Sequence, residues 1–351
     1  MAAINIALIG VGNCAKSLLE GIGYYTTHQD DTTGLMHPLV SGYHPSDIHI
    51  VAAFDIDERK VGKNILEAMR SEPNRTTTIG DALPSTVVVQ RGPTHDSIIP
   101  ELREFFIHES KEPAIDVAEA LRKSKAETVI NYLPTGSDKA TYAYAEAALA
   151  AGCNFINCMP TPIAKDPSWR KKFEAAGLVL MGDDIKSQLG ATILNRTLLS
   201  LLKMRGVRVI SSDQVNYGGN ADHFNLHYRP HAKEASKEAA LTSMLTSEDA
   251  RPAARMSYTE KNYDHKRATI KIQGKLFGHA PVSMDIVLED EDSPNSGGVV
   301  VDAVRMAKVL REKGMAEHAG KACAFLMKSP PVQMPESEAL AFFDQMTGDS
   351  L

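Results

Sequence analysis

The sequence predicts an α/β protein built on a Rossmann-like, doubly wound parallel sheet, and three observations carry that prediction. The first is a strand, a glycine turn and a helix over residues 4–21, INIALIGVGNCAKSLLEG. The second is an apolar run over residues 48–57 that ends in Asp55. The third is the alternation of short apolar runs with helical patterns further along the chain, which is typical of parallel strands joined by helices.

The glycine turn has the features of a dinucleotide-binding loop. Gly10 permits a sharp turn, and Gly12 lets a phosphate approach the backbone. Asn13 and Cys14 open the helix, whose N-terminal N–H groups and dipole favour a pyrophosphate. Glycine turns between a strand and a helix also occur without a ligand, so the loop alone leaves both interpretations open.

Asp55 supports the dinucleotide interpretation. A carboxylate at the end of the second strand binds the diol of an adenosine ribose and disfavours a 2′-phosphate, so NAD is favoured over NADP. Asp55 lies 43 residues after Gly12 (55 − 12), against about 20 in the common fingerprint. An inserted loop over roughly residues 24–47 accounts for the difference and predicts irregular surface chain near the cofactor.

Composition and charge limit the possible function classes. A chain of 351 residues with 43% hydrophobic content suits a globular protein of two domains, or one large domain with an insertion. A net charge of −6 and a pI near 6.1 argue against nucleic-acid or anionic-membrane partners. No signal-peptide pattern and no apolar run of ~18 residues is present, so we expect a cytoplasmic protein. Four scattered cysteines predict neither a disulfide framework nor a thiolate metal site.

The middle of the chain continues the alternating pattern. We expect helices over residues 58–69, 100–107, 114–124, 138–151 and 167–176, and strands over residues 86–92, 127–134, 153–157 and 177–181. The strand over 127–134 ends in a polar, turn-rich segment that contains Tyr132 and Pro134. Ligands bind outside the carboxyl ends of such strands, so this segment is expected beside the cofactor.

The segment GDDIKSQLGATILNRTLLSLL offers a phosphate-binding pattern. Ser187 is expected to open a helix that runs to about residue 202, with Lys186 beside it. A hydroxyl, helix N–H groups and an ammonium can bind a phosphoryl group together. The alternative is that Ser187 only caps its helix and that Lys186 pairs with Asp183 or Asp184, and the local sequence leaves both open.

A strand from Val207, an Asn- and Gly-rich turn and a helix carry the next polar group. Lys233 and Lys237 are one helical turn apart, where like charges either lie in solvent beside glutamates or face an anion. His223, His227 and His231 recur every four residues and superficially suggest a metal site. Pro230 interrupts that run and no thiolate or HExxH partner is present, so we expect no metal ligands.

The C-terminal third begins with two strands, over residues 265–277 and 281–289, that predict an antiparallel sheet able to dock against a copy of itself. We expect a turn over residues 293–298 and then a helix from Val299. A second helix ends near AFLMKSPP, where Lys328 could simply complement the helix dipole. The last helix is expected over residues 336–343.

Eight motifs in the same order resemble those of the myo-inositol-1-phosphate synthase family, in particular its short bacterial form. They are GVGNCA, FDID, INYLPTGS, GDDIKSQ, QVNYGGNADHFNL, KEASK, DSPNSGG and FLMKSPP, which together span nearly the whole chain. The resemblance implies a redox-neutral conversion of D-glucose 6-phosphate to 1L-myo-inositol 1-phosphate (inositol 3-phosphate) on one retained NAD. It implies oxidation at carbon 5, enolisation at carbon 6, aldol closure onto carbon 1 and reduction, as the first step of inositol and hence phospholipid biosynthesis.

The resemblance also implies site residues, which lie in these motifs except for Thr192, four residues after GDDIKSQ. The expected catalytic residues are Lys233, Lys237, Lys328, Asp222, Asn216, Asn220 and Lys186. The expected NAD-binding residues are Gly10, Gly12, Asn13, Cys14, Asp55, Tyr132, Pro134, Asp184, Thr192 and Asp292. The expected substrate-phosphate residues are Ser187 and Gln188.

Three positions depart from the family pattern. Pro281 stands where larger members have a lysine, so the missing cation is expected from Lys186, Lys266 or Arg267. Ala221 replaces the second asparagine of the family's turn, and Gln188 replaces the glycine after the phosphate-site serine. These differences leave the phosphate contacts open but not the reaction class.

The resemblance implies three segments and a homotetramer. They are an NAD-binding domain over residues 1–204, an inserted α+β catalytic and tetramerisation domain over 205–294, and a return to the NAD-binding domain over 295–351. The loop over 24–47 becomes a candidate lid that retains NAD.

An NAD-dependent sugar-phosphate dehydrogenase is the alternative function, but such an enzyme needs one acid/base group rather than a lysine cluster. A non-enzymatic NAD-sensing protein is a third, disfavoured by so many ionisable groups beside the expected turns.

Overall fold

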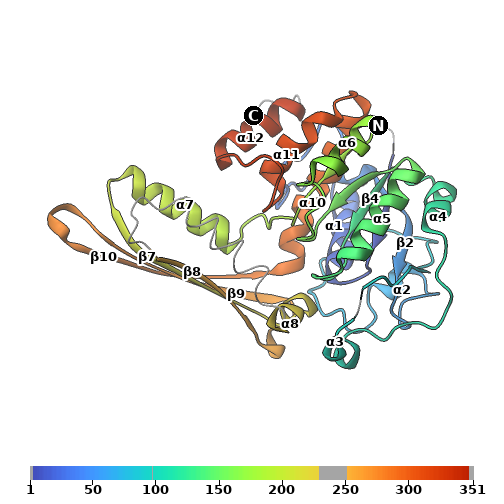
Figure 1. Ribbon diagram of the computed structural model, residues 1–351, viewed down its shortest axis with the longest axis horizontal. Coiled ribbons are helices and arrows are strands. Elements are labelled where there is room, and N and C mark those ends of the chain that lie inside the picture. Colours follow the sequence, from blue (N-terminus) through green and yellow to red (C-terminus); the bar gives the residue numbers. More distant parts are fainter. Residues whose placement is uncertain (1–2, 97, 229–250, 348–351) are drawn as a thin grey trace. The chain divides into compact units, whose positions relative to one another are not determined.

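The computed structural model describes residues 3–96, 98–228 and 251–347 (Figure 1). The chain divides into two compact units, one made of residues 1–187 and 296–351 and the other of residues 188–295. The first boundary lies at 187/188 rather than at the expected 204/205, because the helix over 191–204 packs on the sheet of the second unit.

The first unit is built on a six-stranded sheet in which every pair of neighbours is parallel. Its strands are β1 (Ile4–Ile9), β2 (Ile48–Asp55), β3 (Gln90–Arg91), β4 (Thr128–Asn131), β5 (Asn154–Asn157) and β6 (Leu180–Met181). Their spatial order is β3-β2-β1-β4-β5-β6. This order reverses beside β1, and doubly wound sheets bind ligands at the carboxyl ends of the strands at that point. The predicted Rossmann-like sheet is confirmed.

Helices cover both faces of this sheet. On one face lie α1 (Asn13–Thr27), α10 (Asp292–Glu312), α11 (Ala319–Leu326) and α12 (Glu336–Thr347). On the other lie α4 (Val117–Ser124), α5 (Asp138–Ala151) and α6 (Pro167–Ala175). Because both faces are buried, β1 is apolar from Ile6 to Ile9 instead of alternating: Ile6 and Leu8 face one layer, Ala7 and Ile9 the other.

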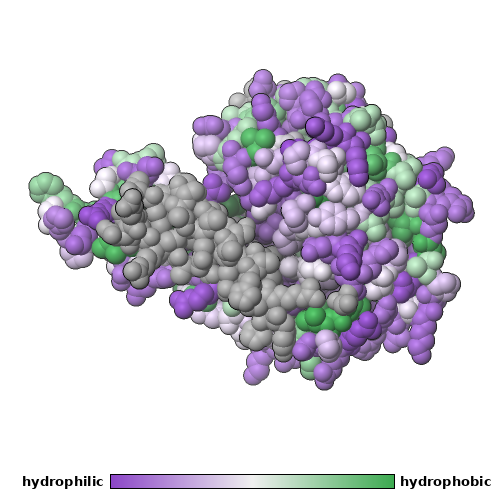
Figure 2. Space-filling view, in the orientation of Figure 1, coloured by the Kyte–Doolittle hydropathy of each residue, from purple (hydrophilic) through white to green (hydrophobic). Residues whose placement is uncertain are grey.

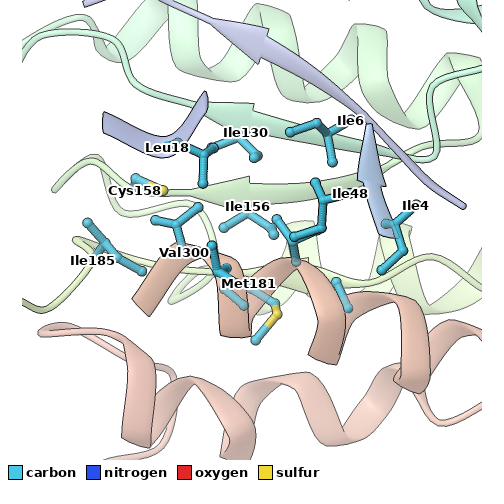
Figure 3. Packing of buried hydrophobic residues seen from close by; sticks show 14 of the residues in the cluster. Ile4, Ile6, Leu18, Ile48, Ile130, Ile156, Cys158, Met181, Ile185 and Val300 are labelled. Carbon is cyan, nitrogen blue, oxygen red and sulfur yellow. The ribbon is translucent and has the colours of Figure 1, made fainter. Parts of the chain in front are cut away.

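The larger core cluster joins the sheet to the C-terminal part of the chain. Figure 3 shows Leu18 of α1, Ile130 of β4, Ile156 of β5 and Val300 of α10 packed together. The C-terminal segment is thus part of the first unit's core. Hydrophilic residues predominate on the face of this unit visible in Figure 2, with smaller hydrophobic patches between them.

The second unit contains a four-stranded sheet in the order β10-β9-β7-β8. Its strands are β7 (Arg208–Gly218), β8 (Arg251–Tyr258), β9 (His265–Lys275) and β10 (Pro281–Glu291). Helix α7 (Ala191–Met204) covers one face through Leu199, which packs near Ile270 and Ile272. The expected antiparallel sheet is mixed, because β8 runs parallel to β7. The sequence of β8, RPAARMSY, lacks the alternation that would have predicted it.

The remaining elements are short. They are the helices α2 (Ile65–Ala68), α3 (Pro100–Phe105) and α8 (Ala221–Tyr228), and the 3₁₀ turns Pro45–Asp47, Glu260–Asn262, Phe277–His279 and Ala316–His318. Within the described ranges, no helix has the length and apolar character needed to cross a membrane.

Four expected elements differ markedly from the structure. The helix predicted over 58–69 is reduced to α2, and the strand predicted over 86–92 to β3. The helix expected from Ser187 begins at Ala191, with Gly190 at its N-cap. Helix α10 begins at Asp292, not after residue 298, since Pro294 lies in its first turn, where a missing N–H costs no helical hydrogen bond.

Candidate active site

The glycine loop leaves room for a phosphate. Gly10 has a φ of +86°, and a Cβ there would lie 2.8 Å from the Tyr132 carbonyl oxygen, so a side chain is excluded. Gly12 is the N-cap of α1, and a Cβ added to it would meet nothing within 4 Å. Gly12 makes no side-chain capping hydrogen bond, and the first turn of an α-helix offers backbone N–H groups that can bind an anion. The loop therefore fits a pyrophosphate.

Asp55 and Asn13 are both fixed beside the loop. Asp55 Oδ2 accepts the Val11 N–H at 2.8 Å, and its Oδ1 accepts the N–H groups of Ile56 and Asp57 at 2.7 and 3.0 Å. Asn13 Oδ1 accepts the Arg75 N–H at 2.8 Å. The carboxylate thus lies at the end of β2 next to the glycine loop, where a ribose diol is bound in folds of this class.

Tyr132 and Pro134 follow the end of β4, the strand next to β1. The Tyr132 hydroxyl oxygen is buried without a hydrogen-bond partner among the described residues. Burial raises the pKa of Tyr132 well above its usual value, so the group stays neutral. Buried hydroxyl groups rarely lack a partner, and a bound ligand is one way to supply it.

Asp184 and Lys328 form an ion pair in the first unit. The segments around Ile185 and Met327 pair as a short antiparallel bridge. Lys328 N–H donates to the Asp184 carbonyl at 2.7 Å, and Lys328 Nζ lies 2.9 Å from Asp184 Oδ1. Helix α11 ends at Leu326, so the Lys328 side chain pairs with a carboxylate beyond the helix end. The pair joins an expected catalytic residue to an expected cofactor residue.

Lys186 has a different partner from those weighed in the sequence. Its ammonium is buried and lies 2.8 and 3.0 Å from the two carboxylate oxygens of Glu336, and it donates to the Ala324 carbonyl at 2.8 Å. It therefore anchors α12 and α11, and its expected catalytic role stays a prediction. Ser187 is buried but does not cap α7, which begins four residues later.

Asp183, next to the pair, is fully buried. It accepts hydrogen bonds from Asn157 Nδ2 and from the N–H groups of Ala164 and Lys165. Burial raises the pKa of Asp183 to about 6 although these donors lower it. Its contacts hold the chain that leads into Asp184, and we assign it a structural role.

In the second unit a carboxylate network surrounds Asn220. Asn220 Nδ2 donates to Asp264 Oδ1 at 3.1 Å and to Asp292 Oδ2 at 3.2 Å. Lys266 Nζ lies 2.9 Å from Asp292 Oδ1. Asn220 Oδ1 accepts the N–H of His223 and its ring Nδ1–H at 3.0 and 3.1 Å. Two expected site residues, Asn220 and Asp292, are thus brought together, and the Lys266 ammonium pairs with the Asp292 carboxylate.

Asp264 was missed in the sequence. Nothing in its local pattern marks it, because it precedes a strand and its partners lie 28 and 44 residues away (292 − 264 and 264 − 220). It is 1% exposed and also accepts the Ser293 N–H and hydroxyl at 3.1 and 3.0 Å. The residue therefore fixes the start of α10 beside Asn220.

Asn216 belongs to a second buried polar chain. Its Oδ1 accepts Gln214 Nε2 at 3.2 Å, and its Nδ2 donates to the Arg255 carbonyl at 3.3 Å. Gln214 in turn accepts Asn195 Nδ2 of α7 at 3.3 Å. These bonds occupy the Asn216 side chain in a structural network between β7, β8 and α7.

The other expected residues are placed as follows. Asp222 lies in the first turn of α8 and Thr192 in the first turn of α7, while the Gln188 N–H donates to the Asn295 carbonyl at 2.9 Å. Lys233 and Lys237 lie outside the described residues. Among the side chains that the structure describes, no group of three or more His, Cys, Asp or Glu is placed to hold a metal ion.

Three of the four cysteines are buried in the first unit. Burial raises the pKa of Cys153 to about 11, that of Cys323 to about 12, and that of Cys158 well above its usual value. A thiolate is the nucleophilic form, so these three side chains act as core residues.

Comparisons with known proteins bear on the family and the fold of the chain. A family model described as myo-inositol-1-phosphate synthase matches residues 190–293. An inositol-3-phosphate synthase of Mycobacterium tuberculosis (strain CDC 1551) is 41% identical over 352 residues, which cover 97% of this chain and 95% of the relative. A solved structure titled Ari2 matches with a TM-score of 0.82 at 33% identity, covering 99% and 98% of the two chains. A myo-inositol-1-phosphate synthase-related protein from Thermotoga maritima shares the fold, with a TM-score of 0.78 at 22% identity over 99% and 98% of the two chains.

Proposed function

The chain belongs to the myo-inositol-1-phosphate synthase family, and we propose that it converts D-glucose 6-phosphate to 1L-myo-inositol 1-phosphate without net redox change. The observation that carries this proposal is the 41% identity to an inositol-3-phosphate synthase over 97% of the chain. The two polar groups around Asp184 and Asn220 support it, because both include residues expected from the family motifs.

We propose NAD as the retained cofactor. Gly12, with open space at its Cβ position, and the α1 N-terminus would hold its pyrophosphate, and Asp55 would hold its adenosine ribose. When bound, NAD would accept a hydride from the substrate and later return it. The chain's own residues must then bind the sugar phosphate, exclude water and move protons.

The Lys328–Asp184 pair is proposed to handle protons. A lysine held by a carboxylate at 2.9 Å can donate a proton to a developing alkoxide and recover it, with Asp184 fixing the position of Nζ. In the second unit, Lys266 is the proposed replacement for the cation missing at Pro281, since Asp292 holds its ammonium. Lys233 and Lys237 keep the catalytic role that the motif KEASK implies.

We further propose that the protein is a cytoplasmic homotetramer. The outward side of the β9–β10 hairpin supports self-association, since Val287 is 54% exposed and Phe277 fully exposed at its turn. Sedimentation equilibrium measures the mass of the assembly in solution. A single species of monomer mass at micromolar protein concentration would refute the homotetramer.

Incubation of the purified protein with ¹³C-labelled glucose 6-phosphate and a catalytic amount of NAD tests the reaction. We expect ¹³C NMR to show inositol phosphate accumulating well beyond the amount of NAD, while absorbance at 340 nm shows no net NADH. NADH formed in proportion to substrate consumed would identify a sugar-phosphate dehydrogenase instead. Nucleotide binding without conversion of this substrate would favour a binding protein.

A further inference from the structure

A closed ring of polar contacts surrounds the Val11 peptide of the glycine loop. The Val11 N–H donates to Asp55 Oδ2 at 2.8 Å, and the Val11 carbonyl accepts Asn74 Nδ2 at 3.0 Å. Lys60 closes the ring: its Nζ lies 3.3 Å from Asn74 Oδ1 and 3.8 Å from Asp55 Oδ2. The loop, the ribose-binding carboxylate and the chain after α2 are thus fixed to one another.

The Lys60 ammonium pairs with the Asp55 carboxylate, and the nearby Asp57 carboxylate also acts on its charge. The Lys60 side chain is 7% exposed and that of Asp55 11% exposed, so solvent screens the pair weakly. In the part of the chain that the structure describes, Lys60 is the one cation within 4.0 Å of this carboxylate. The neighbouring Arg59 is bound to Asp57 and to the Phe106 carbonyl.

We propose that Lys60 is a specificity-determining residue of the dinucleotide site. With Asp55 present, it positions the carboxylate that favours a ribose diol and repels a 2′-phosphate. With Asp55 neutralised, its ammonium becomes a buried charge beside the 2′ position that binds the phosphate of NADP. This inference rests on the proposed binding of NAD at this loop.

Direct binding separates the two roles. Isothermal titration calorimetry with NAD⁺ and NADP⁺ is applied to the wild type, Asp55→Ser, Lys60→Met and the double variant Asp55→Ser/Lys60→Met. We expect Asp55→Ser to shift the ratio of the two dissociation constants toward NADP⁺ by about 10- to 100-fold. The double variant should lose that gain, and Lys60→Met alone should bind NAD⁺ more weakly and still reject NADP⁺.

Two further variants keep the test decisive. Lys63→Met removes a half-exposed lysine of the same turn, which pairs with Glu67, and should leave both dissociation constants unchanged. Asp55→Asn retains an acceptor for the Val11 N–H and carries the test if Asp55→Ser does not fold, as judged by circular dichroism. Equal NADP⁺ binding by the single and double variants would overturn the role of Lys60. A folded wild type that binds neither nucleotide would overturn the proposed cofactor as well.

Discussion

Lys328 is the residue whose chemistry can be tested most directly. It is 40% exposed while its partner Asp184 is 12% exposed, so the ammonium is open to a substrate and fixed from one side. Asp184 adopts a left-handed conformation, with a φ of +63°, that few residues other than glycine occupy. Strained backbone of this kind is concentrated at functional sites, which supports the assignment of the pair to the active site.

Replacement of Lys328 by methionine keeps the length of the side chain and removes the proton donor. We expect kcat to fall by about 10²- to 10⁴-fold, the usual contribution of general acid–base catalysis. The NAD dissociation constant should change less than about threefold, since the glycine loop and Asp55 are untouched. Lys321→Met, on the exposed side of α11 against the Phe342 ring, is the matched control. Near-normal turnover of Lys328→Met would remove this residue from the mechanism.

Local patterns predicted the residues of the glycine loop, but not the partners of buried charges. The positions of Gly10, Gly12 and Asp55 at strand ends could be predicted because they follow from the local pattern, and their NAD-binding roles stay predictions. Lys186 was weighed as a phosphate-binding cation or as a partner of Asp183 or Asp184, and its ammonium pairs instead with Glu336, 150 residues away. No short-range signal specifies such a pair, because only the folded chain brings its members together.

At the scale of elements, hydrophobic periodicity predicted the bounds of a helix or strand correctly where that element is long and regular. Helix α5 has the predicted bounds, and β9 and β10 lie within two residues of theirs. The prediction of a helix over residues 58–69 was wrong for most of that segment. The apolar spacing favours a helix, but backbone hydrogen bonds of turns, such as the one from the Lys60 N–H to the Asp57 carbonyl, form there instead. The start of α10 was predicted too late because the glycines and Pro294 of its first turns are typical of a turn.

The N-terminus of α10 provides an element-scale prediction. The Asp264 carboxylate accepts two hydrogen bonds from Ser293 and favours the positive end of the helix dipole. Asp264→Ala should lower the free energy of unfolding by about 1–3 kcal/mol, because Ser293 and Asn220 lose a buried acceptor. Urea denaturation followed by circular dichroism measures this.

Asp285→Ala supplies the comparison for that experiment. Asp285 lies on β10 and its side chain is 70% exposed, so its loss should change the free energy by less than about 0.5 kcal/mol. Equal effects of the two substitutions would contradict the role of Asp264 at the helix start.

At the scale of the whole chain, the loop after α1 is fastened to the C-terminal segment. Arg305 is fully buried and donates to the carbonyls of His37, Pro38 and Tyr43 at 2.8, 3.1 and 3.0 Å. It also pairs with Asp302. Residues 37–43 are therefore bound to α10, and the lid hypothesis finds no support for this part of the loop, since closing would break these bonds.

His37 makes this fastening dependent on pH. Its ring binds Asp302 through Nδ1 and Asp344 of α12 through Nε2, the latter at 3.0 Å. Burial lowers the pKa of His37, but the hydrogen bonds and charges of Asp302 and Asp344 outweigh burial and leave the pKa above its usual value. The imidazolium is thus stabilised by folding. Its contribution is complete below the unfolded pKa of about 6.5 and is lost as the pH rises through the higher folded pKa.

Substitution of His37 by glutamine should remove that dependence. We expect the wild type to exceed His37→Gln in free energy of unfolding by about 2 kcal/mol near pH 6, the scale of hydrogen bonds to charged groups. The difference should shrink between pH 6 and 9, since the neutral ring in the wild type can donate to only one of the two carboxylates. His49→Gln, at an exposed position of β2, should match the wild type throughout. A difference that stays constant or grows over this pH range would show that folding does not raise the pKa of His37, because only a proton held more tightly in the fold gives a falling difference.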